Sequence, residues 1–119
     1  MVENMGIVSS RFPYFRVTLM VLSRILKIEA LIDTGFDGDV VVPPKMIMNG
    51  RPPSGHTRWT LADGSISFAP YFLGSIKIGK YKPIGVSISA LGDEPLIGRG
   101  ITDRFRVILD HGRKIIIEP

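Results

Sequence analysis

The sequence has no cysteine and no long hydrophobic run. Without cysteine the chain cannot form a disulfide, an Fe–S cluster, a cysteine-ligated zinc site or a thiolate nucleophile, which excludes the thiol proteases. The most apolar early stretch, residues 17–26, contains Arg24 and is about half as long as a membrane-spanning helix. Glu3 precedes the first basic residue, unlike the basic start of a secretory signal peptide. We therefore expect a soluble, unprocessed, cytoplasmic protein with no membrane partner.

Length and composition favour one small β-rich domain. The chain has 119 residues, of which 45% are hydrophobic and 22% charged, so we expect a single domain over residues 1–119. Glycine (13) and proline (9) are both frequent, which favours many turns over a helical bundle. The net charge of +4 is compatible with weak attraction to nucleic acid or acidic peptides but is too diffuse to identify a partner.

Apolar and β-branched residues predict a series of short strands. A hairpin is expected over residues 14–22 and 25–32, with its turn at Ser23-Arg24, and a buried strand at Val40–Val42. Residues 1–10 could be a loose arm or an edge strand added to a neighbour. The further predicted strands are 56–61, 65–68, 71–78, 82–88, 96–98, 105–109 and 113–118, and the predicted helical turns are 45–48 and 102–105.

Two polar loops in this pattern carry glycine. The apolar run Ala30–Ile32 leads directly into a loop that begins Asp33-Thr34-Gly35, and a second apolar run leads into Gly98. Strand, glycine loop and following element therefore occur twice, as a faint duplication. The tripeptide alone is a weak signal, since it arises by chance in roughly a few per cent of chains of this length. Its position directly after a buried strand, however, gives the carboxylate of Asp33 an evident use only in a site.

The motifs around Asp33 resemble those of the retropepsin-like aspartic proteases, in particular the small single-lobe prokaryotic members. The matching segments occur in the order and spacing of that family: Ala30–Gly38, Val40–Pro44, Ala62–Gly64, Pro95–Arg99 and the closing hairpin 105–118. The resemblance implies an all-β, closed or barrel-like acid protease domain with one or two short helices. It also implies a homodimer, because each chain of that family supplies one catalytic aspartate, and it implies neither a metal nor another cofactor.

The resemblance assigns catalytic roles to Asp33, Thr34 and Gly35. Asp33 would be the catalytic carboxylate, and the hydroxyl of Thr34 would hydrogen-bond across the dimer axis and brace both loops. Gly35 would let the backbone turn and approach the substrate closely. The resemblance also implies an ion pair between Asp37 and Arg99 that supports the dimer.

The substrate-binding residues implied by the resemblance are Phe36, Asp37 and the tip of a flap, Ala62, Asp63 and Gly64. The Asp-Gly step of this tip should supply the positive φ angles of a tight hairpin turn. Such a flap folds over a bound peptide and excludes water. Phe36 replaces the small residue usual in viral members, which would narrow the groove, and the tip lacks their glycine-rich sequence.

Elementary chemistry is consistent with this interpretation. Amide hydrolysis without a metal needs one carboxylate that takes a proton from water and one carboxylic acid that gives a proton to the carbonyl oxygen. Two Asp33 carboxylates held close together across a two-fold axis would repel each other and share one proton, so they could perform both tasks. Peptides or unfolded proteins would bind as extended segments through backbone hydrogen bonds.

Other sites are less well supported. Asp33, Asp37 and Asp39 lack the spacing of a calcium loop, and His56 and His111 stand alone. Lys80-Tyr81-Lys82 is a basic-aromatic turn of the kind that contacts single strands, but we expect no nucleic-acid partner. Trp59 could serve as hairpin packing or as a wall of the substrate groove. We expect an aspartic endopeptidase; the alternative is a retropepsin-like dimerisation or peptide-binding module with little or no turnover.

Overall fold

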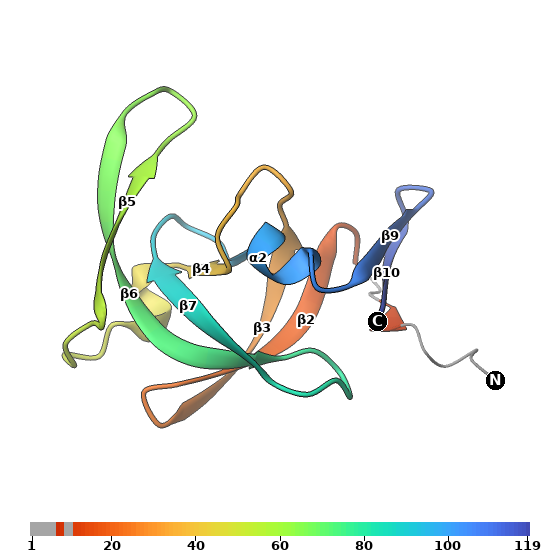
Figure 1. Cartoon of the computed structure of the whole chain (residues 1–119), viewed down its shortest axis with the longest axis horizontal. Coiled ribbons are helices and arrows are strands. Elements are labelled where there is room, and N and C mark those ends of the chain that lie inside the picture. The colour runs from red at the N-terminus through yellow and green to blue at the C-terminus, as the bar shows by residue number, and fades with distance from the viewer. Residues whose placement is uncertain (1–6, 9–10) are drawn as a thin grey trace.

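The computed structural model of the chain describes residues 7–8 and 11–119, and most of its elements are strands (Figure 1). No helix in this part of the chain is long and apolar enough to cross a membrane. The elements are β1 (Ile7–Val8), β2 (Tyr14–Val21), β3 (Arg24–Ile32), β4 (Val40–Val42), α1 (Pro44–Ile47), β5 (Gly55–Thr60), β6 (Ile66–Lys77), β7 (Ile84–Ala90), β8 (Leu96–Ile97), α2 (Arg99–Thr102), β9 (Arg106–Asp110) and β10 (Lys114–Glu118).

The central feature is a closed barrel. Its strands follow the order β2-β3-β8-β4-β7-β6, and pairing of β2 with β6 closes the ring. The remaining strand of this sheet, β5, has β6 as its one partner among the described strands and stands outside the ring. The expected all-β, closed fold with two short helices is therefore confirmed. Closure removes the free strand edges that an open sheet would expose.

The barrel interior is filled by aliphatic and aromatic side chains from every strand of the ring. All three residues of β4 are buried, because this strand lies between β7 and β8 and crosses the middle of the fold. Strand β2 instead alternates, with its buried residues facing the core. The largest fully buried side chains include Phe15, Leu19, Phe72, Ile76, Ile88 and Ile97. The loops at the ends of β3 and β8 are thus anchored to a packed core.

The β2–β3 turn lies one residue earlier than the sequence predicts. Leu22 and Ser23 both have positive φ, 54° and 60°, and Arg24 already belongs to β3, opposite Val21. Two consecutive positive φ values match the right-handed twist of the flanking strands. Neither residue is a glycine or asparagine, so the sequence carried no signal for this turn.

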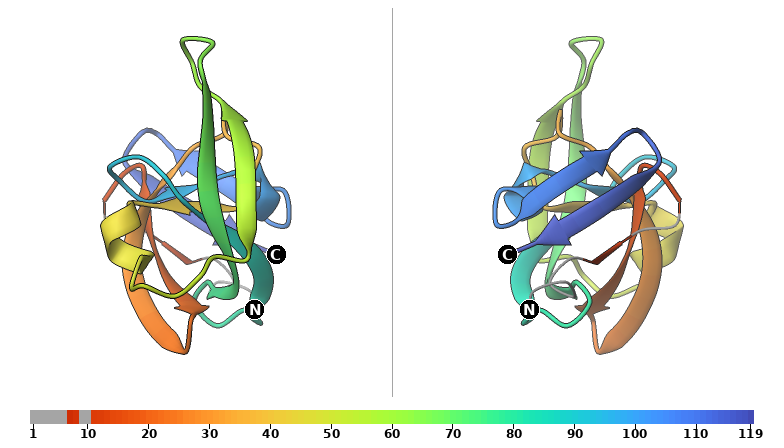
Figure 2. Two further views of the ribbon diagram at one scale, coloured as in Figure 1. Left: turned by 90° about the vertical axis from the view of Figure 1, so that its left-hand side faces the viewer. Right: turned by 90° about the vertical axis from the view of Figure 1, so that its right-hand side faces the viewer.

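Strand β6 is continuous, whereas the sequence suggested separate strands at 65–68 and 71–78. Pro70 lies inside it, opposite His56 of β5. Pairing with β7 begins only at Tyr71, so Pro70 sits where one side of β6 is still unpaired and an N–H is not needed there. The strand can therefore run from the barrel into the β5–β6 hairpin that projects from it (Figures 1 and 2).

The second helix starts earlier than predicted. Residues 102–105 were expected to be helical, but α2 spans Arg99–Thr102 and only turn-like hydrogen bonds continue to Phe105. The first N–H groups of a helix need partners outside it, and here Arg99 and Gly100 donate to carbonyls of the loop after β3. The other helix, α1, begins at Pro44, a residue well suited to a first helical position.

A second, smaller sheet lies beside the barrel (Figure 2). Its order is β1-β10-β9, and the predicted hairpin at the end of the chain forms it, with Ile115 and Ile117 buried. Ile7 and Val8 pair with β10 of the same chain. The rest of the expected arm, residues 1–6 and 9–10, lies outside the described residues.

Candidate active site

The backbone holds Asp33 at the end of β3. Its N–H donates to the carbonyl of Ile97 at 2.9 Å, and its own carbonyl accepts from the N–H of Phe36 at 3.2 Å. One carboxylate oxygen, Oδ1, accepts from the N–H of Gly35 at 2.9 Å. The side chain is half-buried. The loop therefore fixes the orientation of this carboxylate and leaves its second oxygen open to the cavity described below.

The Asp33 loop, residues 33–39, is tied to the Gly98 segment, residues 97–100. Besides the bond from Asp33 to Ile97, the N–H groups of Gly98, Arg99 and Gly100 donate to the carbonyls of Asp39, Phe36 and Gly38 at 2.8–2.9 Å. A Cβ at Gly98 would lie 2.6 Å from the carbonyl oxygen of Phe36, so only glycine fits. The faint duplication in the sequence thus corresponds to two loops that support each other.

Asp39 is a structural member of the same loop. Its Oδ2 accepts from the N–H of Ser87 in β7 at 3.0 Å, which joins the loop to a third part of the barrel. Asp33 and Asp39 therefore bind different backbone groups, while Asp37 is exposed. Among the described residues, no group of three or more His, Cys, Asp or Glu side chains is placed to hold a metal ion.

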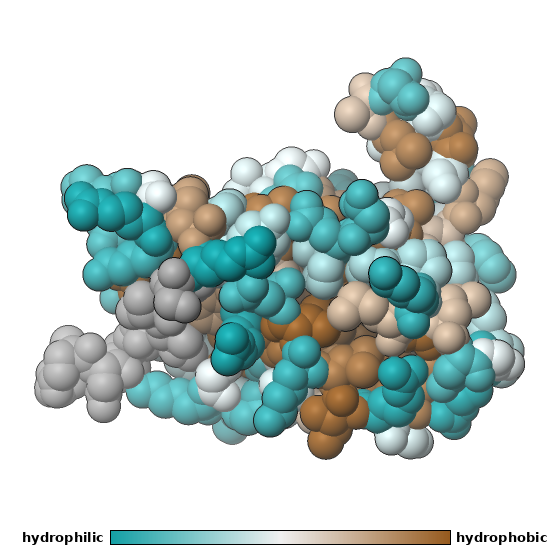
Figure 3. Space-filling view, turned by 180° about the vertical axis from the view of Figure 1, so that it is seen from behind, coloured by the Kyte–Doolittle hydropathy of each residue, from teal (hydrophilic) through white to brown (hydrophobic). Residues whose placement is uncertain are grey.

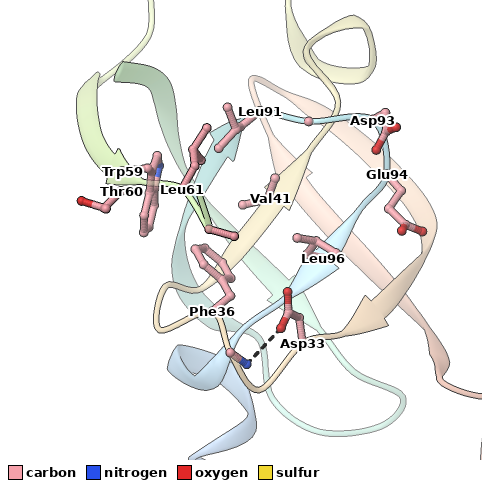
Figure 4. Close-up of a pocket in the computed structure, with 13 residues that line it drawn as sticks. Asp33, Phe36, Val41, Trp59, Thr60, Leu61, Leu91, Asp93, Glu94 and Leu96 are labelled. Atoms are coloured by element: carbon pink, nitrogen blue, oxygen red, sulfur yellow. Dashed lines mark hydrogen bonds between the residues drawn. The ribbon is translucent and has the colours of Figure 1, made fainter. Parts of the chain in front are cut away.

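A cavity of about 420 Å³ lies beside Asp33 (Figure 4). Asp33 points into it, and the side chains of Val41 and Leu96 form part of its apolar wall. Its lining comes from the Asp33 loop, from β4 and β8, from the β5–β6 hairpin and from the loop between β7 and β8. The lining residues are Asp33, Gly35, Phe36, Val41, Trp59, Thr60, Leu61, Ala62, Leu91, Gly92, Asp93, Glu94 and Leu96.

The cavity brings together four of the eight residues that the sequence analysis assigned to catalysis or substrate binding. Asp33, Gly35, Phe36 and Ala62 line it. The remaining four are exposed and, within one described chain, are not among its lining residues; they are Thr34, Asp37, Asp63 and Gly64. The predicted ion pair between Asp37 and Arg99 does not form among the described residues: the two segments are joined by backbone hydrogen bonds and both side chains face solvent.

We call the projecting part of the β5–β6 hairpin, residues 55–69, the flap. Trp59 on its inner side packs on Phe36, with ring centroids 4.9 Å apart and planes inclined by 55°. Trp59 therefore packs on the Asp33 loop and also lines the cavity. Its Nε1 is buried and has no hydrogen-bond partner among the described residues. The space-filling view shows hydrophobic side chains on the flap as well (Figure 3), where Ile66 and Phe68 are exposed.

The flap tip differs from the predicted tight turn. Only Gly64 has positive φ, 86°, and Asp63 does not. The N–H of Gly64 donates to the carbonyl of Leu61 at 2.9 Å, and the N–H of Leu61 donates to the carbonyl of Ser65 at 2.8 Å. The loop is therefore one residue longer than a two-residue hairpin turn. Oδ1 of Asp63 accepts from the hydroxyl of Ser65 at 2.6 Å and from its N–H at 2.9 Å. These bonds lower the pKa of Asp63, whose carboxylate thus stabilises the tip itself.

Sequence analysis missed the loop between β7 and β8. This loop, residues 91–94, follows a buried strand, as the Asp33 loop follows β3. The repeated order of buried strand and polar loop was the signal that the sequence offered. Oε1 of Glu94 accepts from the hydroxyl of Tyr14 at 2.8 Å. That hydrogen bond, together with burial, raises the pKa of Tyr14.

Comparison with known proteins supports the fold. No protein-family model and no curated protein sequence matches the chain. Among solved structures, the chain is similar to the crystal structure of a retropepsin-like aspartic protease from Rickettsia conorii, with a TM-score of 0.63 and 23% sequence identity. The match covers 94% of this chain and 89% of that one. The chain therefore has the retropepsin-like fold expected from its motifs.

Proposed function

We propose that the protein is an aspartic endopeptidase that acts as a homodimer. The observation that carries this proposal is the position of Asp33, whose carboxylate is oriented by the N–H of Gly35 and points into a cavity that the flap helps to line. A carboxylate fixed by backbone donors at the wall of a groove is suited to proton transfer. The shared retropepsin-like fold adds weight, although fold alone does not establish activity.

Two copies are needed because the sequence contains a single Asp-Thr-Gly. In the proposed dimer, the Asp33 carboxylates of the two chains lie side by side and hold a water molecule between them. One carboxylate is ionised and takes a proton from this water while the water oxygen attacks the carbonyl carbon of the scissile peptide bond. The other carboxyl group is protonated and gives its proton to the carbonyl oxygen. Thr34, exposed next to Asp33, is available to brace the pair.

The proposed substrate is an extended peptide segment of an unfolded or flexible protein. The cavity has an apolar wall and one side open to solvent, and the flap contributes Trp59, whose buried Nε1 has no acceptor among the described residues. Apolar side chains of an extended segment would pack against this wall, while its backbone remains free to form hydrogen bonds. Ala62, Asp63 and Gly64 would close over the peptide, and Phe36 would narrow the groove beneath it.

The test is cleavage of an unfolded protein by the wild type and by Asp33→Asn between about pH 3 and pH 7. The shared-proton mechanism predicts activity that falls at both ends of the pH range, since one carboxylate must be ionised and the other protonated. The variant should lose at least about a hundredfold in kcat/KM, while molar mass and unfolding midpoint stay unchanged.

A wild type that dimerises but cleaves nothing, or a variant as active as the wild type, would refute the protease. Peptide binding without turnover would instead support the alternative of a retropepsin-like binding module. If the protein binds nucleic acid with an affinity that falls steeply with salt and is unchanged by Asp33→Asn, neither the protease nor the peptide-binding module is supported.

A further inference from the structure

The cavity is acidic although the chain as a whole is basic. The net charge of the sequence is +4, yet of the described residues that line the cavity three are carboxylates, Asp33, Asp93 and Glu94, and none is Lys, Arg or His. Charges of one sign in a cleft with apolar walls concentrate the field of that sign inside it. The local field therefore attracts cationic groups.

The two carboxylates of the β7–β8 loop differ in how far other groups compensate their charge. Asp93 is exposed and has no hydrogen-bond or ion-pair partner among the described residues. Glu94 accepts a neutral donor, the hydroxyl of Tyr14, at one oxygen. Arg11 lies on that side, with its guanidinium 3.8 Å from the centre of the Tyr14 ring, and attraction to Glu94 is one of the smaller causes, after its hydrogen bond with Glu29, that raise the pKa of Arg11. Arg11 forms its ion pair with Glu29 at 2.6 Å and does not line the cavity.

The opposite side of the cavity is aromatic. In Figure 4, Phe36 and Trp59 lie across the cavity from Asp93 and Glu94, with Leu96 between them. Aromatic faces attract ammonium and guanidinium groups and also pack against aliphatic stems. A lysine or arginine side chain satisfies both sides at once, because its stem is apolar and its end is cationic. Glutamate or aspartate would meet repulsion from three carboxylates.

We infer that this cavity selects a lysine or arginine side chain of the substrate, placed next to the scissile bond, and that Asp93 and Glu94 determine this selectivity. The inference rests on the proposed protease function for the cleavage assay, but it can also be tested by binding alone. It assigns a substrate class, basic peptide segments, to the site at Asp33.

The experiment uses peptides that differ only at one residue beside the scissile bond: lysine, the uncharged norleucine, or glutamate. The wild type should cleave the lysine peptide about fivefold faster in kcat/KM than the norleucine peptide, the size expected for a partly exposed charge pair, and the glutamate peptide slowest. The preference should shrink as salt rises, because exposed charges are screened.

The matched variants are Asp93→Asn with Glu94→Gln, which keep side-chain shape and an acceptor for Tyr14. They should bring the lysine-to-norleucine ratio close to one. Asp103→Asn removes one exposed negative charge at the C-terminal end of α2, outside the cavity, and should leave the ratio unchanged. Equal cleavage of both peptides by the wild type, or an unchanged ratio in the double variant, would overturn the inference while leaving the protease intact.

Binding separates this inference from the proposed function. Trp59 is the single tryptophan and lines the cavity, so its fluorescence reports occupancy. Asp33→Asn should bind the lysine peptide about fivefold more tightly than the norleucine peptide, whether or not the wild type cleaves. Equal binding would contradict the selectivity; preferential binding by a wild type that cuts nothing would support it and refute only the protease.

Discussion

The two sides of the cavity are built on different physical principles. On the barrel side, the Asp33 loop and the Gly98 segment are joined by four backbone hydrogen bonds, from Asp33, Gly98, Arg99 and Gly100, above a packed core. On the flap side, the tip residues 61–65 are all exposed, and the aromatic contact of Trp59 with Phe36 joins the flap to the loop.

This difference assigns the two sides different tasks. Elements with many buried contacts open only with the whole domain, whereas exposed hairpins can move separately. The barrel side therefore fixes the carboxylate, and in the proposed protease the flap would open for a substrate and close over it. Stability is therefore expected to reside on the barrel side and adaptability on the flap.

The largest effect on stability is expected from Gly98→Ala. The new methyl group would collide with the carbonyl of Phe36, 2.6 Å away, and with the Phe36 ring, so the two loops must separate. We expect a loss of about 3 kcal/mol in the free energy of unfolding, measured by urea denaturation. Gly85→Ala is the matched control, since a Cβ there meets no atom within 4 Å. Equal midpoints for the two variants would show that the loops are not tightly joined.

An intermediate effect is expected for the aromatic contact. A double-mutant cycle of Phe36→Leu and Trp59→Leu should give a coupling of about 1 kcal/mol in the free energy of unfolding. The control cycle combines Phe36→Leu with Phe68→Leu in place of Trp59→Leu. Phe68 is in the flap but 68% exposed, so this cycle should give no coupling. A coupling of similar size in both cycles would mean that the flap is not held through Trp59.

The smallest effect is expected at the flap tip. Gly64 has a φ of 86° and open space around it, so Gly64→Ala introduces only backbone strain, about 1 kcal/mol. Gly64→Asn should cost less still, because asparagine adopts this conformation more readily. A loss as large as that of Gly98→Ala in the same urea titration would remove the distinction between the two sides.

The same distinction explains what could be predicted from the sequence. The strands of the barrel, the buried Val40–Val42 and the loop that begins at Asp33 were predictable, because local apolar patterns and the Asp-Thr-Gly motif specify them. The sequence shows that Asp93 and Glu94 follow a buried strand, but their position beside the cavity depends on the parallel pairing of β3 with β8, which has no local signal. The contact of Trp59 with Phe36 likewise depends on how the flap bends over the loop, a tertiary feature without a local signal.

Three local differences have a similar origin. The turn at Leu22 and Ser23 adopts positive φ because strand twist requires it, α2 starts early because loop carbonyls accept its first N–H groups, and the tip carboxylate of Asp63 binds Ser65. Each depends on partners that neighbouring sequence does not reveal.

The central claim is that two chains each contribute one Asp33 to a shared site. Mixing wild-type protein with Asp33→Asn at constant total concentration, with full subunit exchange, tests it most directly, because inactive hybrids form. Activity should follow the square of the wild-type fraction and fall to about one quarter in an equal mixture. A linear decrease, to about one half, would mean that each chain works alone and would contradict the shared site.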